Sequence, residues 1–265
     1  MSGFNEISPT NLMRLIGTPQ CPVLIDVCMD EDFAEHPYLV PTAKRRDYAD
    51  IAGIADKVAG ASAVIICQKG KKLSHGVAAQ LRGKGIKAQV LAGGNHAWRD
   101  SALPRIPAKV IPGKIWVTRH RPKIDRIACP WLIRRFVDPD ASFLFVPPAE
   151  VEAVAERFDA TPFDIEGVFW SHRNAFCTFD TMISEFGLSH PALDTLAQVV
   201  RAADTNQHDQ AAQAAGLLAV SVGLSRMYRD DNTQLEKGLT LYDALYRWSR
   251  DGQDEGHTWP TTPSK

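Results

Sequence analysis

The sequence predicts an α/β fold: a parallel sheet with flanking helices, followed by a mainly α-helical domain with a small sheet. Three short apolar runs, at residues 22–27, 63–66 and 88–91, alternate with helical patterns. Such alternation is typical of a parallel sheet whose strands are joined by right-handed crossovers. After a proline-rich stretch at residues 103–113 the apolar spacing becomes mostly helical, which indicates a second domain of a different class.

Cap and turn residues mark the helices of the first domain. Ser8 and Pro9 are typical of the cap and first residue of a helix, which we expect to run to Ile16 and to stop at Gly17. After the second apolar run, Ser74 is placed to cap another helix, which glycines end. The apolar residues of this helix are Val77, Ala78 and Leu81, and the glycines that end it are Gly83 and Gly85.

Between the second apolar run and this helix, the chain places a thiol in a tight loop. Cys67 ends the run, and Lys69, Gly70, Lys71 and Lys72 follow it. A strand, a loop and a helix in this order direct main-chain N–H groups and the positive end of a helix at one point. Buried packing is the ordinary role of a free cysteine, but three ammonium groups argue against a packed loop. We therefore predict that Cys67 is a nucleophile near neutral pH that attacks a small anion.

Three motifs around this thiol resemble those of the rhodanese (sulfurtransferase) family. They are a Leu-Ile-Asp-Val strand at residues 24–27, a Cys-x-x-Gly-x-Lys-x-Ser loop at 67–74, and a Gly-Gly-x-x-Ala-Trp segment at 93–98. The likeness covers residues 5–108, which corresponds to one complete rhodanese domain with its parallel sheet.

The resemblance implies a reaction at Cys67. The thiol would take the sulfane sulfur of a donor such as thiosulfate, become a persulfide, and pass the sulfur to a thiol or to cyanide, with no cofactor required. The N–H groups that cradle the substrate anion would come from the following loop. Its residues are Gln68, Lys69, Gly70, Lys71, Lys72 and Leu73.

The chain departs from the rhodanese pattern in two places, and it lacks the pattern of a rival chemistry. Cys28 follows Val27 where many rhodaneses carry arginine, and the usual Gly-His-Ile-Pro-Gly-Ala segment is degraded at residues 35–43. These changes concern the mouth of the pocket and thus the choice of donor.

Cysteine phosphatases need an arginine six residues after the cysteine, to bind the oxyanion bidentately. Leu73 occupies that position, so phosphatase activity is not expected.

Length and composition bound the remaining function classes. With 265 residues, 45% of them hydrophobic, the chain has material for two cores. A net charge of −1 gives no general attraction to nucleic acid, and no apolar stretch is long enough to cross a membrane. The five cysteines are scattered, which predicts neither a disulfide framework nor a Cys-x-x-Cys zinc site and favours a cytoplasmic location. The N-terminus lacks the pattern of a signal peptide.

We expect the chain to divide at its proline-rich stretch. The predicted parts are a rhodanese-like domain at 1–108, a proline-rich linker at 109–113 within a region that starts at 103, a second domain at 114–250, and a disordered tail at 251–265. Prolines in the linker are expected to break any regular element.

The second domain is predicted to be mainly helical. Strands are expected at 114–119 and 143–146, and a helix at 130–137 with Pro130 in its first turn. A capping box at Thr233 and Glu236 is placed to open the last helix. The other helices are expected at residues 149–158, 178–186, 191–203 and 210–227, and the last at 234–250.

Several segments of this domain resemble the C-terminal domain of the chromate-resistance proteins of the ChrB type. The likeness extends over residues 114–250 and implies a role in the response to chromate or oxidative stress. Regulators of that family carry a DNA-binding part before this domain, whereas a rhodanese-like domain stands here in its place. Nucleic acid is therefore not an expected partner. The segments are residues 123–131, 130–136, 171–180, 201–209 and 216–226.

Polar residues in these segments suggest a ligand site of one of two kinds. Asp125, His172, Asp204 and Asp209 would suit a first-row divalent metal such as Mn, Fe or Zn. A structural role is the alternative: Asp180 and Asp209 are both placed to cap helices, and Cys129 and Cys177 to pack in the core.

The second kind of site would bind an oxyanion. Residues 113–135 hold seven basic residues against one acid, and Arg126, Arg134 and Arg135 are the candidates to bind chromate, sulfate or thiosulfate. The alternative interpretation is that these basic residues form a solvated face of the protein.

Together with these residues, the two resemblances imply a sulfurtransferase that uses a Cys67 persulfide, joined to a domain that binds a metal ion or an oxyanion. Its partners would be a small-molecule sulfur donor and a thiol acceptor, with neither nucleic acid nor a membrane. Two alternatives remain open. The chain could be a chromate or metal sensor whose rhodanese-like domain only binds anions, or a metal-dependent enzyme seated in the C-terminal domain.

Overall fold

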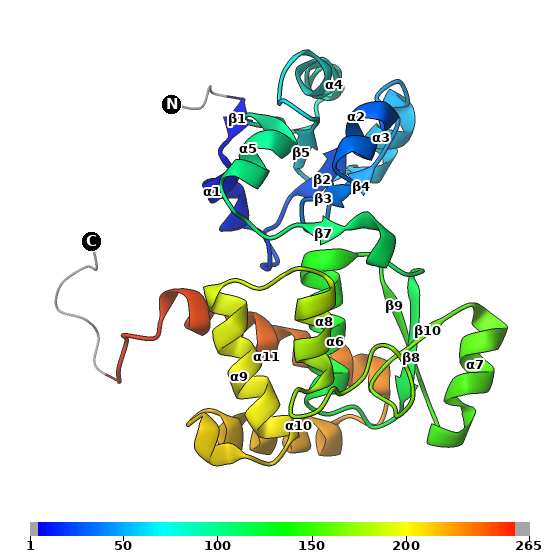
Figure 1. The fold of residues 1–265 in the computed structure, drawn as a ribbon, viewed down its shortest axis with the longest axis vertical. Helices are drawn as coiled ribbons and strands as arrows, with labels where there is room; N and C mark the ends of the chain where they lie inside the picture. Colours follow the sequence, from blue (N-terminus) through cyan, green and yellow to red (C-terminus); the bar gives the residue numbers. More distant parts are fainter. Residues whose placement is uncertain (1–4, 258–265) are drawn as a thin grey trace.

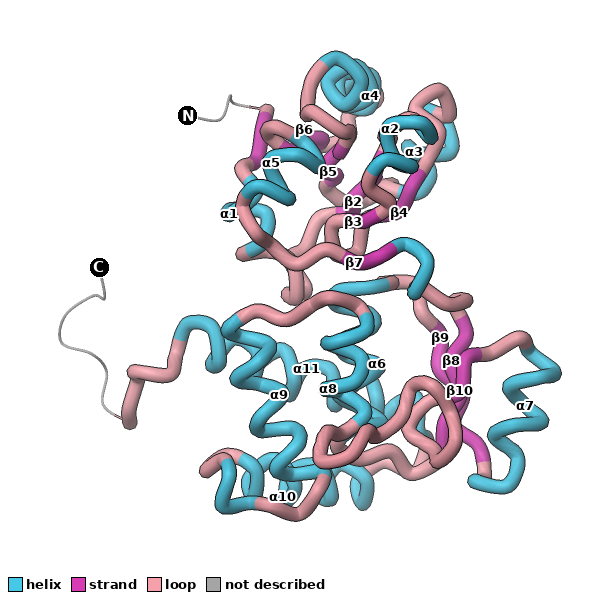
Figure 2. Tube along the Cα trace, viewed as in Figure 1, coloured by secondary structure: helices cyan, strands magenta, loops and turns pink. Residues whose placement is uncertain are grey.

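A computed structural model describes residues 5–257 of the chain. It shows an α/β region formed by the N-terminal part of the sequence and a largely helical region formed by the rest (Figure 1). Figure 2 shows that the two main sheets lie in separate parts of the molecule, the smaller one at the side of the helical region. The predicted fold class is confirmed.

The first region contains a five-stranded sheet in the order β1-β6-β5-β2-β4, in which every pair of neighbouring strands is parallel. The strands are β1 (Glu6–Ile7), β2 (Val23–Asp26), β4 (Lys44–Arg45), β5 (Ala63–Ile66) and β6 (Ala88–Leu91). The helices are α1 (Pro9–Met13), α2 (Asp30–Glu35), α3 (Ile51–Lys57), α4 (Lys72–Gly83) and α5 (Gly94–Asp100).

The two faces of this sheet enter different cores, as the side-chain period of two in a strand requires. On β5, Ala63 and Ile65 pack in a cluster with residues of α3 and α4. Val64 and Ile66 face the opposite side, where α1 and α5 pack. This second cluster continues into the helical region, so the two cores expected from the composition are not divided between two domains.

The second region contains the parallel sheet β10-β8-β9 and a group of helices. The strands are β8 (Ile115–Arg119), β9 (Ser142–Val146) and β10 (Thr161–Pro162). The helices are α6 (Asp125–Leu132), α7 (Val151–Phe158), α8 (Thr178–Glu185), α9 (Pro191–Asp204), α10 (Ala214–Met227) and α11 (Asp231–Asp251), with short turns of 3-10 or π-helix at η2 (Ile133–Val137), η3 (Pro148–Glu150) and η4 (His208–Gln210).

Pro130 does not lie in the first turn of its helix, as predicted, but inside α6. The helix begins five residues earlier, at Asp125, so the proline removes an internal hydrogen-bond donor. The chain then widens into the π-turn η2, in which the N–H of Asp138 donates to the carbonyl of Ile133 at 2.7 Å. Because of this wider turn, the helical segment that contains Pro130 continues as far as Val137 within the core.

Other helix limits also differ from the prediction. Ser8 caps α1 as expected, but that helix ends at Met13. Helix α4 begins at Lys72, so Ser74 lies within it, and α10 begins only after η4. Asp230, rather than Thr233, caps α11, because its carboxylate accepts the N–H of Thr233 at 2.7 Å. The helices α2, α3 and α5 were not predicted.

The proline-rich stretch forms regular structure, contrary to the prediction. Strand β7 (Ile106–Pro107) pairs antiparallel with β3 (Tyr38–Leu39), and the 3-10 turn η1 (Ala108–Val110) follows. A two-stranded ladder leaves one edge of each strand open, which is where a proline without an N–H is tolerated. The stretch therefore follows the surface of the first region instead of spanning free space.

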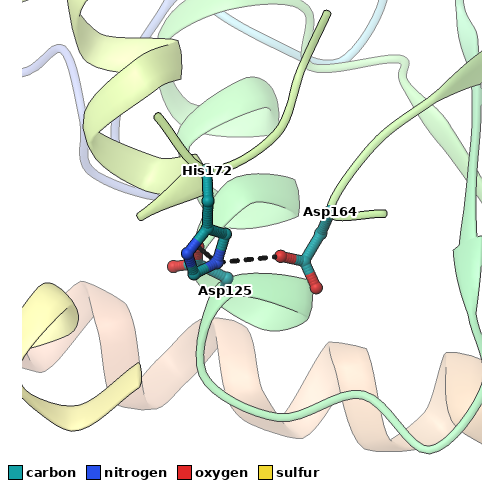
Figure 3. Close-up of side chains that lie close together, drawn as sticks. All are labelled: Asp125, Asp164 and His172. Carbon is teal, nitrogen blue, oxygen red and sulfur yellow. Dashed lines mark ion pairs between the residues drawn. The ribbon is translucent and has the colours of Figure 1, made fainter. Parts of the chain in front are cut away.

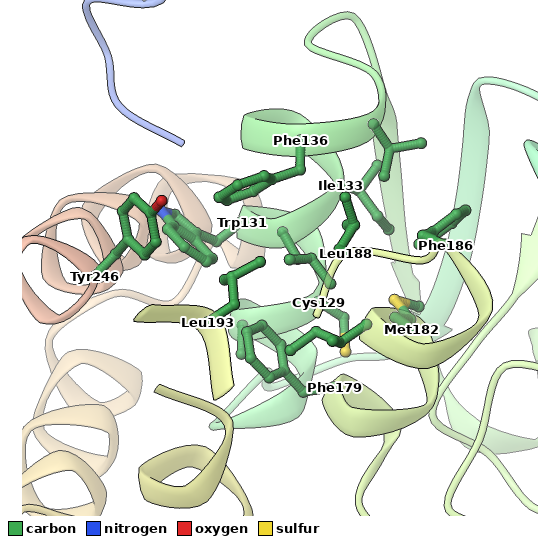
Figure 4. Packing of buried hydrophobic residues seen from close by; sticks show 14 of the residues in the cluster. Cys129, Trp131, Ile133, Phe136, Phe179, Met182, Phe186, Leu188, Leu193 and Tyr246 are labelled. Carbon is green, nitrogen blue, oxygen red and sulfur yellow. The ribbon is translucent and has the colours of Figure 1, made fainter. Parts of the chain in front are cut away.

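The two regions are joined through one continuous core. Figure 4 shows its central part, where Trp131, Phe136 and Tyr246 pack together. Gly17 of the first region lies directly against Phe136 and Tyr246, and a side chain at this position would collide with both rings. The N–H of Thr42 donates to the carbonyl of Phe136 at 2.7 Å. Movement of one region relative to the other would thus expose apolar rings.

Within residues 5–257, no helix is both long and apolar enough to cross a membrane. Asp251, the first residue of the predicted disordered tail, ends α11, and residues 258–265 of that tail lie outside the described part of the chain.

Candidate functional site

Cys67 lies where β5 ends and the loop to α4 begins. Its residue is only 5% exposed, and its Sγ lies 3.1 Å from the Oγ of Ser74 in the first turn of α4. Ser74 is also within 3.2 Å of the carbonyl of Lys71. Because one hydroxyl can rotate between these partners, Ser74 can donate to the sulfur once Cys67 is a thiolate. The sequence predicted Ser74 as a helix cap and missed this contact.

The loop after Cys67 turns its carbonyl groups toward the protein. The first turn of α5 supplies the donors: the N–H of Asn95 donates to the carbonyl of Cys67, and the N–H of His96 to that of Gln68, both at 3.0 Å. Among the described residues, none donates to these carbonyls except from α5, and the N–H groups of residues 68–71 make no hydrogen bond to protein atoms. A loop with bound carbonyls and free N–H groups beside a helix N-terminus is suited to bind an anion.

Two glycines allow the loop and α5 to come this close. Gly70 has a φ of +59°, and a Cβ on it would lie 2.5 Å from the carbonyl oxygen of Leu91. Gly94 has a φ of +60°, and a Cβ on it would collide with the main chain of residues 67–70. This contact explains why the Gly-Gly motif accompanies the cysteine loop although the two are far apart in the sequence.

A buried carboxylate stabilises the same contact between α5 and the cysteine loop. Asp26, at the end of β2, accepts the N–H of Cys28 at 2.7 Å and the side-chain amide of Asn95 at 3.1 Å. Its residue is fully buried, and burial raises its pKa above the ordinary value. Asn95 therefore joins β2 to the cysteine loop, through its side chain on one side and its main-chain N–H on the other.

The three loop lysines, Lys69, Lys71 and Lys72, are exposed, as their charge requires. Gln68 contacts Glu35 at 3.3 Å and lines a hollow that Cys28 and His96 also line. Burial raises the pKa of Cys28 to about 12, which keeps this second thiol protonated at neutral pH. All five cysteines of the chain are free.

A second cluster of polar residues lies in the helical region, centred on His172 (Figure 3). The Nε2 atom of His172 lies 3.1 Å from a carboxylate oxygen of Asp204, 3.5 Å from one of Asp164 and 3.6 Å from one of Asp125. Ligand atoms of Asp125, Asp164 and His172 all lie within 4.8 Å of one another. The contacts with Asp164 and Asp204 raise the pKa of His172 to about 10.

Asp125 is the most deeply placed member of this cluster. It is fully buried at the start of α6, and its Oδ2 accepts the N–H groups of Thr178 and Phe179, at 2.6 and 3.3 Å, at the start of α8. Its other oxygen, Oδ1, has no hydrogen-bond partner. Burial, and the nearby carboxylates of Asp204 and Asp164, raise the pKa of Asp125 well above its ordinary value.

Asp164 is held by groups on three sides. The hydroxyl of Thr178 donates to its Oδ1 at 2.9 Å, and Arg119 and Arg126 lie 3.2 and 3.3 Å from its Oδ2. Asp164 was missed in the sequence. Asp164 follows β10 and Asp125 follows β8, and the carboxyl ends of neighbouring parallel strands meet at one edge of a sheet. No strand was predicted at β10, so this neighbourhood is visible only in the structure.

The structure corrects one of the four predicted metal ligands. Asp125, His172 and Asp204 come together, but Asp209 is exposed on η4 and makes no contact with the cluster. The reason is that α9 ends at Asp204 and the chain turns away before η4. Asp180 has the structural role foreseen for it: its carboxylate accepts the N–H of Cys177 at 3.0 Å at the start of α8.

The three predicted oxyanion-binding arginines do not form one site. Arg126 lies at the cluster and pairs with Asp164, whereas Arg135 binds Asp243 with two hydrogen bonds of 2.8 Å and Arg134 pairs with Glu236. Both arginines of η2 line a hollow between the two regions together with Lys44 and Lys57, but those lysines are also paired, with Asp138 and Asp140. Cys129 and Cys177 are fully buried, which confirms their predicted packing role.

Comparison with known proteins identifies a family for the C-terminal part of the chain. A family model described as "ChrB, C-terminal domain" matches residues 116–249. Protein ChrB of Cupriavidus metallidurans is 32% identical over 145 residues, which are 54% of this chain and 43% of that protein. The chain thus spans less than half the length of this curated relative.

Two solved structures align with the other part of the chain. A rhodanese-like domain protein from Staphylococcus aureus is 26% identical, over 36% of this chain and 91% of that one, with a TM-score of 0.32. A thiosulfate sulfurtransferase from Pseudomonas aeruginosa is 21% identical, over 40% of this chain and 20% of that one, with a TM-score of 0.36.

Proposed function

Because the chain belongs to the family of the ChrB C-terminal domain, we propose that it serves chromate resistance as a sulfurtransferase, with Cys67 as the sulfur carrier. Residues 114–250 would act as the effector-binding part, with a metal ion or an oxyanion as the effector. The protein would work in the cytoplasm with a small-molecule sulfane donor and a thiol acceptor.

The reaction follows from the chemistry of a thiolate beside an anion-binding loop. The Cys67 thiolate attacks the sulfane sulfur of thiosulfate, the S–S bond of the donor breaks, and sulfite leaves with the electron pair. A thiolate or cyanide then attacks the terminal sulfur of the persulfide and regenerates the Cys67 thiolate. Free N–H groups of the loop would hold the anionic part of the donor, and Ser74 would donate a hydrogen bond to the sulfur.

One observation carries this proposal: the carbonyls of residues 67 and 68 are bound by α5, while the N–H groups of residues 68–71, in the loop that follows Cys67, are left free. A cysteine that served only in packing would not need this arrangement. The exposed lysines add positive charge at the entrance, which favours approach of a dianionic donor.

The test is sulfur transfer from thiosulfate to cyanide by the purified full-length protein. We expect Cys67→Ser to abolish turnover, because an alkoxide is scarce at neutral pH and cannot form a persulfide. Cys28→Ser and Cys21→Ser are the matched controls and should retain it. Mass spectrometry after incubation with thiosulfate should find one added sulfur atom on the peptide that contains Cys67. Activity that survives in Cys67→Ser would refute the assignment.

A second function is favoured by the degraded segment at residues 35–43 and by Cys28 in place of the arginine. In that case the N-terminal region binds anions without turnover, and the chain is a sensor. Thiosulfate or sulfate that protects Cys67 from alkylation, in a wild-type protein without turnover, would support the sensor and exclude the enzyme.

A further inference from the structure

We propose that Asp125, Asp164, His172 and Asp204 form a binding site for one divalent first-row cation of the Mn²⁺ or Fe²⁺ type. This assignment names the effector that was left open above for the C-terminal region. It rests on that effector-binding role and is independent of sulfur transfer at Cys67.

The distances from His172 to the three carboxylates are those of ligands around one ion, and ligand atoms of Asp125, Asp164 and His172 also lie within 4.8 Å of one another. Metal–ligand bonds to imidazole nitrogen and carboxylate oxygen are about 2.0–2.2 Å long, so neighbouring ligand atoms lie about 3.0–3.6 Å apart in octahedral or tetrahedral geometry. Nε2 of His172 lies 3.1, 3.5 and 3.6 Å from one oxygen each of Asp204, Asp164 and Asp125. If His172 had only a structural role, its Nε2–H would need one acceptor, and three carboxylates at such similar distances would not be required.

The buried oxygen of Asp125 is an independent indication of a missing partner. A buried polar atom without a hydrogen bond lowers the stability of a fold, and a charged one lowers it more. Asp125 is fully buried, yet its Oδ1 has no partner, while its Oδ2 is fixed by two main-chain N–H groups. The oxygen that lies 3.6 Å from His172 is Oδ2, so a cation bound here by both oxygens of the carboxylate would supply the partner that Oδ1 lacks.

The remaining contacts orient the proposed ligands as supporting groups do in metal sites. Thr178 joins two of them, since its N–H donates to Asp125 and its hydroxyl to Asp164. Arg119 and Arg126 hold the other oxygen of Asp164. These contacts leave Oδ1 of Asp164 and Oδ2 of Asp204 directed at His172.

Charge decides between a cation and an oxyanion at this place. Three carboxylates converge on the imidazole, and both nearby arginines are already paired with Asp164. A dianion such as chromate would meet carboxylates at each of these positions, and like charges repel strongly at such short range. The mixture of oxygen ligands with one imidazole suits Mn²⁺ or Fe²⁺.

The site is accessible from outside. A surface hollow lined by Arg119, Asp164, Glu166, Ser171 and His172 opens over it. The side chain of His172 is 41% exposed and that of Asp204 20% exposed, whereas Asp125 and Asp164 form the floor. An ion can therefore enter from this hollow and keep part of its coordination shell toward solvent.

Titration of the metal-free full-length protein with MnCl₂, followed by the loss of the free Mn²⁺ signal in electron paramagnetic resonance, tests the proposal. We expect one Mn²⁺ per chain and a higher thermal midpoint when it is bound. Asp204→Asn and His172→Gln should each weaken binding by at least about tenfold. Asp209→Asn is the matched control, because it removes an exposed carboxylate near Asp204 that does not touch the cluster. It should bind Mn²⁺ like the wild type.

Each other outcome is informative. Failure of the wild type to bind Mn²⁺, or equal weakening in Asp209→Asn and Asp204→Asn, would overturn the proposal. Stabilisation by chromate or sulfate that Arg126→Ala removes, without an effect of Mn²⁺, would overturn it in favour of an oxyanion site. Circular dichroism establishes that each variant is folded. Cys67→Ser should bind Mn²⁺ normally, so loss of sulfur transfer and loss of the cation site are separable results.

Discussion

Replacement of Gly94 by alanine tests whether the approach of α5 to the cysteine loop holds the site together. The new Cβ would lie 2.9 Å from the carbonyl carbon of Gln68, and closer still to the carbonyl oxygen of Cys67 and the nitrogen of Gly70. All three contacts are with main chain, which cannot rotate away. The loop must therefore move by about 0.5 Å or more to restore normal van der Waals distances.

The cost has two parts. A non-glycine residue in the left-handed region costs about 1 kcal/mol at the φ of +60° that Gly94 adopts. Overpacking a tight contact adds about 1–3 kcal/mol. We expect Gly94→Ala to lower the free energy of unfolding by about 2–4 kcal/mol. Because the loop carries the sulfur and its N–H groups, sulfur transfer should fall by at least about tenfold in the folded protein.

Urea denaturation and sulfur-transfer kinetics measure these two effects. Gly76→Ala is the matched control, since Gly76 lies exposed in α4, and a Cβ there meets nothing within 4 Å. That substitution should be neutral or stabilise the protein by up to about 1 kcal/mol. A Gly94→Ala protein with the stability of Gly76→Ala and undiminished sulfur transfer would refute the close packing described here.

Three further predictions concern reactivity and pH. Ser74→Ala should slow alkylation of the Cys67 thiol by iodoacetamide about tenfold, with little loss of stability. The reason is that a hydrogen bond to a charged group contributes about 1.5–3 kcal/mol. An unchanged rate would show that Ser74 does not stabilise the Cys67 thiolate. Changing the three loop lysines to glutamine should raise the KM for thiosulfate and slow alkylation, and an unchanged rate would mean that the N–H groups alone set the reactivity. Burial lowers the pKa of His190 from 6.5 to about 4. Unfolding therefore takes up a proton below pH 6.5, and the free energy of unfolding should fall by up to about 3 kcal/mol between pH 6.5 and 4. The contribution of His190 should be constant above that range, and His190→Gln should lack it. An identical pH dependence in the two proteins between pH 6.5 and 4 would contradict this prediction.

The shared core has a consequence for how the two parts of the chain communicate. Gly17, Phe136 and Tyr246 meet where the α/β region packs on the helical region, and Phe136 follows α6, the helix that begins with Asp125. Helix α6 and the aromatic residues after it therefore connect the polar cluster to the first region through continuous side-chain packing. Whether a ligand at the cluster changes sulfur transfer is directly measurable with the variants described above.

The sequence by itself determined the features that depend on neighbouring residues. The apolar runs predicted three of the five strands of the main sheet, because a strand buried on both faces has a continuous apolar run in its own sequence. Cys67 was recognisable since the strand, the loop and the helix that surround it are consecutive. The limits of helices were predicted less well. Ser74 and Thr233 both carry capping side chains, but the two helices begin earlier, at Lys72 and Asp231.

Only the tertiary structure decided the composition of the polar cluster and the union of the two regions. Asp164 joins the cluster because β10 pairs beside β8, whereas Asp209 leaves it because α9 ends five residues earlier. The contact of Gly94 with the cysteine loop likewise depends on where α5 begins. The physical reason is common to these cases: a local pattern fixes which face a side chain takes, but only packing of distant segments fixes which side chains meet.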